Sequence, residues 1–277
     1  MDFLRVGLCQ MKVKEDKLEN IKKAENMIKD LANKGAKLIV LPEMFNCPYN
    51  NSNFKEYAEK YPNGKTIKKL SDIANRENVH VVGGSIPEKD DEGNIYNTSF
   101  IFDNNGKLLD RHRKMHLFDI DVEGGVTFKE SDVLSPGNKV TVVDTPFGKI
   151  GIAICYDIRF PELTRLMVKK GARVVIIPAA FNMTTGPAHW EVTFKARALD
   201  NQIYMLATAP ARDVSASYHS YGNSLIVNPW GDVISRLDEK EGTIIKDLDL
   251  NKIDKIRNQL PLLKHLRKDL YKIKEIE

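Results

Sequence analysis

Short apolar runs alternate with segments of helical periodicity along most of the chain. Residues 3–10 have the pattern of a strand, and the next segment repeats apolar residues every three or four positions, as one face of a helix does. The repeating residues are Leu18, Ile21, Ala24, Ile28 and Leu31. Gly35 ends this helix, and the apolar run at 37–42 (KLIVLP) follows at once as a second strand. This order of strand, helix and strand predicts an α/β architecture.

The same alternation continues through most of the remaining sequence. We expect further strands at 79–86, 94–102, 107–112, 140–144, 149–155, 172–180, 203–209, 221–227 and 243–248. We expect further helices at 66–78, at 161–170 and from residue 187 onward. The NNG turn at 104–106 and the TPFG turn at 145–148 join the strands on either side of them into hairpins.

Three segments do not fit this alternation. Residues 44–53 and 115–139 lack periodicity and are rich in polar and turn-forming residues, so we expect loops there. Long loops in compact domains are usually functional, and we expect Tyr49 to point inward from the first of them. Residues 260–271 mix leucine with lysine and arginine, which predicts an arm or helix that packs on a neighbouring molecule.

A single cysteine lies where an apolar strand changes into a helix, in the stretch KIGIAICYDIRFPE at 149–162. Pro161 and Glu162 suit the first turn of a helix, so Cys155 is expected at a strand-to-helix corner. A thiol close to a helix N-terminus is biased towards the thiolate, with a pKa below the usual value of about 8.5. The corner therefore favours a nucleophile, although a buried structural cysteine would fit the same pattern.

Two charged residues follow other predicted strands. Glu43 comes directly after the run at 37–42, and Lys114 lies just beyond the strand expected near 107–112. If these strands are neighbours of the Cys155 strand in one sheet, the carboxylate, the ammonium and the thiol meet where the strands end. A buried ion pair between Glu43 and Lys114 with no chemical role is the alternative interpretation.

Three phrases carry a resemblance to a known family: LPEMF at 41–45, RKMHLFDID at 113–121 and GIAICYDIRFPE at 151–162. They resemble the nitrilase superfamily of carbon–nitrogen hydrolases, and the resemblance extends over residues 6–271. It implies a four-layer αββα sandwich, which the pattern of apolar residues alone does not predict.

The resemblance also implies roles for individual residues. Cys155 is the expected nucleophile that forms a thioester, and Glu43 is the expected base. Lys114 and the backbone N–H of Tyr156 are expected to face the oxyanion, while Glu130 holds Lys114 or the water. Such a site needs neither a metal ion nor an organic cofactor.

Further phrases, at 178–190 and 208–213, resemble the omega-amidase branch, which hydrolyses 2-oxoglutaramate and 2-oxosuccinamate to the dicarboxylate and ammonia. The candidate substrate-binding residues are Tyr49, Tyr156, Phe181 and Thr184. A far carboxylate needs cationic or N–H partners, and the candidate arginines are Arg159, Arg173, Arg197 and Arg212. Amidases for N-carbamoyl amino acids or deaminated glutathione and true nitrilases share the same catalytic set. From another class, a non-catalytic binding module on this fold is the alternative.

Composition limits the remaining possibilities. The 277 residues are 42% hydrophobic and 29% charged, which fits a single domain at 1–277 with residues 260–277 as a C-terminal arm. The net charge of +4 comes from 42 basic and 38 acidic residues without an arginine-rich stripe, so no nucleic-acid partner is expected. No apolar run approaches the roughly 18 residues of a membrane span, so we expect a cytoplasmic protein without a membrane partner. Three cysteines without paired spacing support neither a disulfide framework nor a structural metal.

The sequence also allows a metal site or a Cys–His hydrolase as alternatives, and the family resemblance implies a homodimer. His112, His116, Asp119 and Asp121 could be drawn as a metal site, but this segment lacks helical periodicity. A Cys–His hydrolase would pair Cys155 with His189 or His116. The superfamily's usual dimer implies a homodimer, with residues 161–170 and the C-terminal arm as the expected interface.

Overall fold

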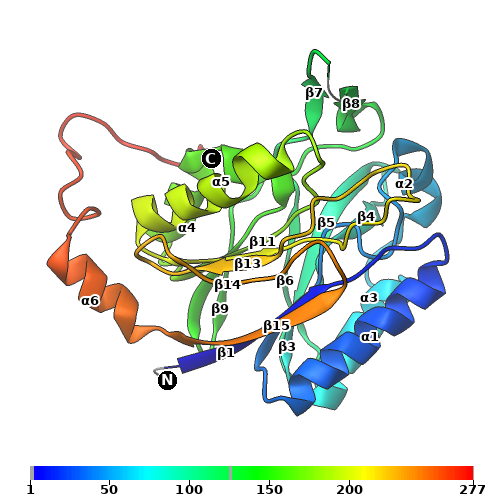
Figure 1. Cartoon of the computed structure of the whole chain (residues 1–277), viewed down its shortest axis with the longest axis horizontal. Helices are drawn as coiled ribbons and strands as arrows, with labels where there is room; N and C mark the ends of the chain where they lie inside the picture. Colours follow the sequence, from blue (N-terminus) through cyan, green and yellow to red (C-terminus); the bar gives the residue numbers. More distant parts are fainter. Residues whose placement is uncertain (1–2, 125–126, 277) are drawn as a thin grey trace.

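Two stacked β-sheets with helices on both outer faces make up the computed structural model, which describes residues 3–124 and 127–276 (Figure 1). The first sheet contains, in spatial order, β15 (Gly242–Asp249), β1 (Phe3–Gln10), β2 (Leu38–Val40), β3 (His80–Val82), β5 (Ile95–Phe102) and β4 (Ile86–Lys89), with β6 (Leu108–Arg113) also paired to β5. The second contains β14 (Val233–Arg236), β13 (Leu225–Val227), β12 (Tyr204–Thr208), β11 (Val174–Pro178), β10 (Gly148–Ile152) and β9 (Thr141–Thr145).

The central strands of both sheets are parallel and buried on both faces, which explains their uninterrupted apolar runs. Successive side chains of a strand point to opposite faces, and β2 shows the result. Leu38 and Val40 lie in the core between the sheets, together with Ile152 and Ile176 of the second sheet. Ile39 instead packs in the core beneath the helices that cover the first sheet.

The outer layers are helical. The helices α1 (Lys17–Asn33) and α3 (Lys65–Glu77) cover the first sheet, and α4 (Pro161–Lys169) and α5 (Gly186–Asn201) cover the second (Figure 1). The shorter helices α2 (Asn51–Tyr57) and α6 (Asn251–Gln259) lie outside these layers. The four-layer αββα sandwich that the family resemblance implied is confirmed.

One expectation about the sheets is wrong. The strands before Glu43, Lys114 and Cys155 are not neighbours in one sheet, since β2 and β6 belong to the first sheet and β10 belongs to the second. The run at 37–42 pairs with β1 and β3, whereas β10 pairs with β9 and β11. The three residues can therefore meet only across the seam between the sheets.

Several predicted loops contain short elements. Residues 51–53, assigned to a loop, begin α2, because the Asn50 side chain accepts a hydrogen bond from the N–H of Ser52 and caps that helix. The segment 115–139 contains the hairpin of β7 (Asp119–Asp121) and β8 (Thr127–Lys129), then the 3₁₀ helix η1 (Glu130–Asp132). This hairpin projects from the sandwich (Figure 1).

The C-terminal segment is an arm rather than a helix in the described residues. Helix α6 ends at Gln259, before the expected arm or helix at 260–271. The described residues after α6 form turns and return to this chain's own α4, where the Lys169 ammonium donates to the Ile273 carbonyl and Lys170 pairs with Glu275 at 2.5 Å. Among the described residues, no helix has the length and apolar character needed to cross a membrane.

Candidate active site

Glu43 is placed by the turn that follows β2. The linker between β3 and β4 holds this turn, because the Ser85 hydroxyl accepts a hydrogen bond from the Met44 N–H at 3.0 Å and the Ser85 N–H donates to the Pro42 carbonyl at 3.2 Å. Gly84, with φ of +53°, lies so close that a Cβ there would be 2.1 Å from the Pro42 carbonyl oxygen. Only glycine fits this contact without movement of the Glu43 backbone.

Cys155 begins the 3₁₀ helix η2 (Cys155–Arg159), which lies between β10 and α4. Its φ of +45° is in the left-handed region that residues other than glycine rarely adopt, so the nucleophile candidate has a strained backbone. The predicted start of the following helix at Pro161 is confirmed, and the 3₁₀ turn separates Cys155 from that α-helix. The thiol is therefore not at the N-terminus of an α-helix.

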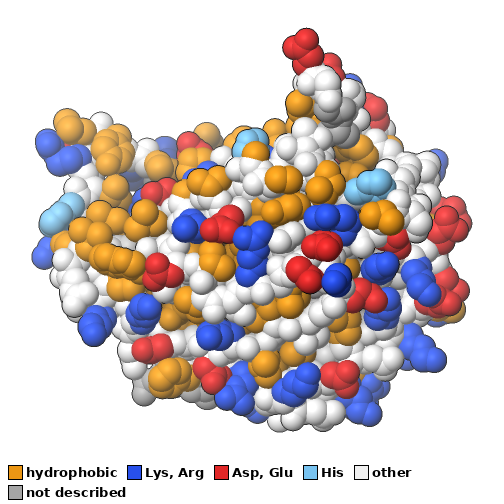
Figure 2. All heavy atoms as spheres, viewed as in Figure 1, with side chains coloured by type: hydrophobic (Ala, Val, Ile, Leu, Met, Phe, Trp, Pro, Cys, Tyr) orange, Lys and Arg blue, Asp and Glu red, His pale blue; other side chains and the backbone are white. Residues whose placement is uncertain are grey.

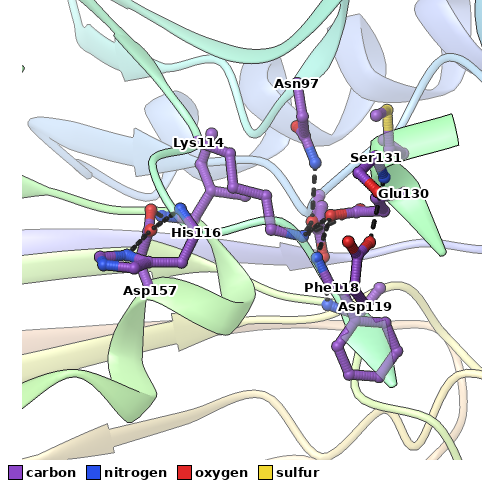
Figure 3. A network of polar contacts seen from close by, with 12 residues as sticks. Asn97, Lys114, His116, Phe118, Asp119, Glu130, Ser131 and Asp157 are labelled. Atoms are coloured by element: carbon purple, nitrogen blue, oxygen red, sulfur yellow. Dashed lines mark hydrogen bonds and ion pairs between the residues drawn. The ribbon is translucent and has the colours of Figure 1, made fainter. Parts of the chain in front are cut away.

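Lys114 lies between two carboxylates, and all three side chains are fully buried. Its Nζ is 3.3 Å from Oε1 of Glu43 and 2.8 Å from Oε2 of Glu130. The Tyr49 hydroxyl donates to Glu130 at 2.6 Å and is 3.5 Å from Glu43. Figure 3 shows the Lys114 side chain reaching towards Glu130 and Asn97. The Tyr49 side chain does point inward, as its loop predicted.

Two further groups fix the Glu43 carboxylate. The Asn97 amide donates to Oε1 at 2.8 Å, and the Ala180 N–H donates to Oε2 at 2.7 Å. The Cys155 thiol also hydrogen-bonds to this carboxylate. Because Ala180 and Cys155 follow strands of the second sheet, Glu43 joins groups from both sheets into one cluster. The structure thus brings together Glu43, Lys114, Cys155 and Glu130, as predicted.

Burial and charge set the protonation of the cluster. Burial and the adjacent Glu43 carboxylate raise the pKa of the Cys155 thiol well above its usual value. The predicted bias towards a thiolate is therefore wrong. Burial also raises the pKa of Glu43, although Lys114 partly opposes the shift. Burial disfavours the charge of Lys114, but Glu130 and Glu43 outweigh it and raise the pKa of the ammonium. The resting site combines a neutral thiol with a charged lysine.

Aromatic side chains surround the cluster. Tyr49 stacks on Tyr218 with ring centroids 4.6 Å apart, and Phe128 lies 5.7 Å from Tyr49. The Tyr218 hydroxyl donates to the Ala180 carbonyl. Ala180, whose N–H binds Glu43, is therefore also held by the aromatic side chains around the cluster. A cavity of about 810 Å³ opens onto Tyr49, Tyr218 and Glu43.

The other candidate substrate-binding residues lie at different depths. Tyr156 is half-buried against Phe118, with ring centroids 5.2 Å apart. Phe181 is buried against Trp190, with ring centroids 5.1 Å apart. Thr184 is exposed, and its N–H donates to the Asn182 side chain at 3.1 Å, so the structure does not bring it into the buried cluster.

The four candidate arginines have different surroundings in the structure. Arg173 pairs with Asp254 at 2.7 Å, far from the cluster in the fold, and Arg197 and Arg212 each donate to two backbone carbonyls. The Arg159 guanidinium lies over the rings of Tyr156 and Phe181, at 5.7 and 4.9 Å from their centroids. Within the described part of the chain, Arg159 has no carboxylate partner; its NH1 meets Nδ1 of His189 at 3.2 Å.

The alternative sites are not formed. His112 and His116 both bind the Asp157 carboxylate, while Asp119 and Asp121 accept hydrogen bonds from Ser131 and Thr127. Residues 3–124 and 127–276 contain no cluster of histidine, cysteine and acidic side chains that could hold a metal ion. The polar partners of the Cys155 thiol are Glu43 and Ala180 rather than His116 or His189, which argues against a Cys–His pair.

Three residues of the site region were not predicted from the sequence: Asn97, Asp157 and Tyr218. A signal for Asn97 exists, because three consecutive polar residues, NTS at 97–99, interrupt an otherwise apolar strand and are buried. Tyr218 lies in a loop whose sequence has no such signal. Asp157 was seen only as part of the turn after Cys155.

The fold and this buried cluster agree with the comparisons to known proteins. The chain belongs to the carbon–nitrogen hydrolase family, whose model matches residues 5–258. Omega-amidase NIT2 of Danio rerio is 47% identical over 277 residues, which cover 100% of this chain and 99% of that protein. Omega-amidase NIT2 of Xenopus tropicalis is 49% identical over 275 residues, with 99% of each chain covered.

A solved structure gives the same result. Saccharomyces cerevisiae Nit3, a member of branch 10 of the nitrilase superfamily, matches with a TM-score of 0.90 and 42% sequence identity. The match covers 96% of this chain and 97% of that chain. The superfamily predicted from the three sequence phrases is confirmed.

Proposed function

We propose that this protein is an omega-amidase, which hydrolyses the terminal amide of 2-oxoglutaramate and 2-oxosuccinamate to the 2-oxo dicarboxylate and ammonia. The observation that carries the proposal is the buried cluster of Cys155, Glu43 and Lys114, together with the Arg159 guanidinium at the end of the nucleophile turn, which has no carboxylate partner among the described residues. The omega-amidases that resemble this chain over its whole length support the same activity.

In the proposed acylation step, Glu43 takes the proton of the Cys155 thiol as the sulfur attacks the amide carbon. Removal of the proton during attack suits a thiol whose pKa is raised by burial and by the Glu43 carboxylate. The electron pair of the carbonyl moves onto oxygen, beside the Lys114 ammonium and the Tyr156 N–H. Glu43 passes the proton to the leaving nitrogen, the C–N bond breaks, and ammonia departs from a thioester.

Deacylation uses the same groups. Glu43 takes a proton from water while the water oxygen attacks the thioester carbon. The C–S bond then breaks, the sulfur regains a proton from Glu43, and the carboxylic acid is released. Glu130 stays bound to Lys114, to Tyr49 and to the Phe118 N–H at 2.7 Å throughout. Its proposed role is to hold the lysine, so that Glu43 remains available as the base.

Arg159 is the proposed partner of the distal carboxylate. A carboxylate that leaves water needs a charged or N–H partner, and the aromatic rings beneath Arg159 hold its guanidinium in place. Tyr156 and Phe181 would contact the short carbon chain between the two ends of the substrate. Tyr49 and Tyr218 would close the other side, which excludes bulky peptidic amides.

A substrate comparison tests this specificity. Catalytic efficiency on 2-oxosuccinamate should exceed that on a neutral short-chain amide by at least about tenfold to a hundredfold, because a charge-assisted contact contributes about 1.5–3 kcal/mol. Arg159→Gln should remove most of this preference. Arg173→Gln, at a surface ion pair, serves as the control and should retain it.

Other outcomes of this experiment would replace the proposal. Equal efficiency on the charged and the neutral amide would reject an omega-amidase. A preference for an N-carbamoyl amino acid or for deaminated glutathione would assign the protein to another amidase branch. Failure of any amide to release ammonia would favour a binding module.

The proposal includes a cytoplasmic homodimer of a single domain, with residues 260–277 as an arm and with no nucleic-acid or membrane partner. Support for the dimer comes from the exposed side chains Val192 and Leu199 of α5, with Trp230 beside them, at exposed fractions of 59%, 43% and 49%. Figure 2 shows hydrophobic side chains gathered over α4, α5 and the C-terminal segment. Apolar surface of this kind is typical of a protein interface.

A further inference from the structure

Besides Glu43 and Glu130, a third buried carboxylate lies beside the site and takes no part in the chemistry described above. Asp157 belongs to the turn that begins with Cys155, and its side chain is fully buried. Its Oδ2 accepts a hydrogen bond at 3.0 Å from the N–H of Ile154, the residue before the nucleophile. The same oxygen is 3.0 Å from Nε2 of His112.

The other oxygen of Asp157 binds the opposite side of the site. Its Oδ1 accepts hydrogen bonds from the backbone N–H of His116 at 2.9 Å and from Nδ1 of the same residue at 2.7 Å. His112 and His116 flank Lys114, each two residues away, and Figure 3 shows Lys114, His116 and Asp157 together. One carboxylate therefore connects the segment that carries the lysine to the turn that carries the thiol.

Both histidines are themselves held in place. The Thr141 hydroxyl is 3.0 Å from Nδ1 of His112, so a neutral His112 can accept there and donate to Asp157 through Nε2. The ring of His116 stacks on Phe160, with centroids 3.7 Å apart and an interplanar angle of 12°. These contacts leave each ring with one orientation in which it donates to the carboxylate.

We propose that Asp157, His112 and His116 are positioning residues that set the distance between Cys155 and Lys114. This inference rests on the proposed roles of those two residues in amide hydrolysis. The cysteine is held in a strained left-handed conformation, and the lysine comes from a strand of the other sheet. Glu43 contacts both residues, but it is the group that exchanges protons in the reaction, whereas the four hydrogen bonds to Asp157 connect the backbone beside the thiol to the segment beside the lysine.

Asp157→Asn tests the proposal, because asparagine offers one acceptor oxygen and turns an NH₂ group towards the other donors. A misplacement of about 1 Å at a reacting group costs about a hundredfold, so we expect kcat to fall by about that factor. KM should change by less than about threefold, because the groups that bind the substrate are untouched. Values are compared per folded molecule.

Glu88→Gln is the matched control for a purely structural loss. Glu88 is also buried and also accepts four hydrogen bonds, three of them from Arg111 and Arg113 on the strand that carries His112. The control should lower the thermal midpoint as Asp157→Asn does, yet leave kcat within about threefold of the wild type. Equal losses of kcat in both variants would overturn the proposal.

Conservative replacements of the histidines give a test that does not depend on Asp157→Asn folding. His116→Asn and His112→Gln place an amide donor near Nδ1 and Nε2, so both should keep kcat within about threefold of the wild type. His116→Leu and His112→Leu remove the donor and should lose about tenfold or more. The proposal fails if the leucine variants turn over as fast as the amide variants.

Failure of the proposed function would look different from failure of this inference. Appreciable turnover by Cys155→Ala would reject the assigned nucleophile and with it the basis of the inference. If Cys155→Ala is inactive while Asp157→Asn keeps the wild-type kcat, the assigned chemistry stands and Asp157 has no positioning role.

Discussion

The two glutamates at Lys114 have different surroundings, and this difference separates their roles. Glu130 accepts from the lysine, from Tyr49 and from the Phe118 backbone, so both of its oxygens are occupied by donors. Glu43 accepts from Asn97 and Ala180 but also meets the thiol, whose proton the proposed reaction must move. One carboxylate holds the lysine while the other exchanges protons.

Replacement of Cys155 should separate activity from folding. Cys155→Ala should abolish turnover and lower the free energy of unfolding by about 1 kcal/mol, because only a small buried volume is lost. Cys155→Ser should be almost as inactive, because a hydroxyl is far less acidic than a thiol. Ammonia release and urea denaturation measure the two effects. Loss of activity in Cys9→Ala with activity retained in Cys155→Ala would contradict the assignment.

The pH dependence should report the shifted carboxyl group. Glu43 acts as a base only when ionised, and burial raises its pKa above the usual value of 4.5. Activity should therefore fall as the pH drops, with a midpoint in kcat/KM above 4.5. Glu43→Gln should lose several orders of magnitude at every pH, with its fold intact by circular dichroism. A histidine variant with the same loss would restore the Cys–His interpretation.

At the level of elements, glycines allow backbone contacts that fix the turns before the reacting side chains. Gly84 contacts the Pro42 carbonyl just before Glu43, and a Cβ on Gly137 would lie 2.2 Å from the Arg113 carbonyl just before Lys114. Both contacts join a loop to the end of a strand. The backbone of the site is thus fixed by close packing against residues distant in the sequence as well as by hydrogen bonds.

Gly84→Ala should disturb this arrangement. The added methyl group cannot fit 2.1 Å from a backbone oxygen, so the turn carrying Glu43 must move. We expect a lower thermal midpoint and a kcat reduced about a hundredfold by displacement of the base. Gly93→Ala is the control, since Gly93 also has positive φ, +94°, but its nearest neighbour is the end of Lys89 at 4.0 Å. This control should lose stability through backbone strain and keep its kcat.

The sequence predicted the long elements well, because their signals are local. Helix α1 begins at the Asp16 cap and repeats apolar residues until Asn33, and the strands around TPFG form the expected hairpin. The hairpin at 119–129 was missed because β7 and β8 have three residues each, too few for a period to show. The run at 79–86 divides into β3 and β4 because the backbone at Gly84 takes a positive φ of +53°, which interrupts the strand before it continues along β5 in the same direction.

The candidate site was predicted less completely. Glu43, Lys114 and Cys155 follow strands, which a sequence shows, but assignment of the strands to sheets depends on pairings far apart in the chain. The protonation state of the Cys155 thiol was predicted wrongly, because burial and the adjacent Glu43 carboxylate, rather than the nearby helix, determine the direction of its pKa shift. Asp157 and Tyr218 became visible as site residues only through contacts with distant residues.

At the scale of the whole molecule, the apolar face of α5 leads to a prediction about assembly. If this face is the dimer interface, Val192→Glu should give a monomer in sedimentation at micromolar concentration, because a buried unpaired carboxylate opposes association. Leu18→Glu is the control, since Leu18 is 51% exposed on α1, on the opposite outer layer. Sedimentation of the wild-type protein as a monomer would contradict the proposed dimer interface.

The division of the site between two sheets also has a consequence for the chain while it is being made. The base, the lysine and Glu130 come from the first 130 residues, and the thiol and the Ala180 N–H come later. A ribosome-bound chain that reaches only to residue 130 holds two carboxylates and a lysine without a nucleophile, and its first sheet still lacks β15 (Gly242–Asp249). Hydrolysis can begin only after the strands that carry Cys155 and Ala180 have been made and have packed on those that carry Glu43 and Lys114, so a chain that ends at residue 130 cannot consume the cell's amides.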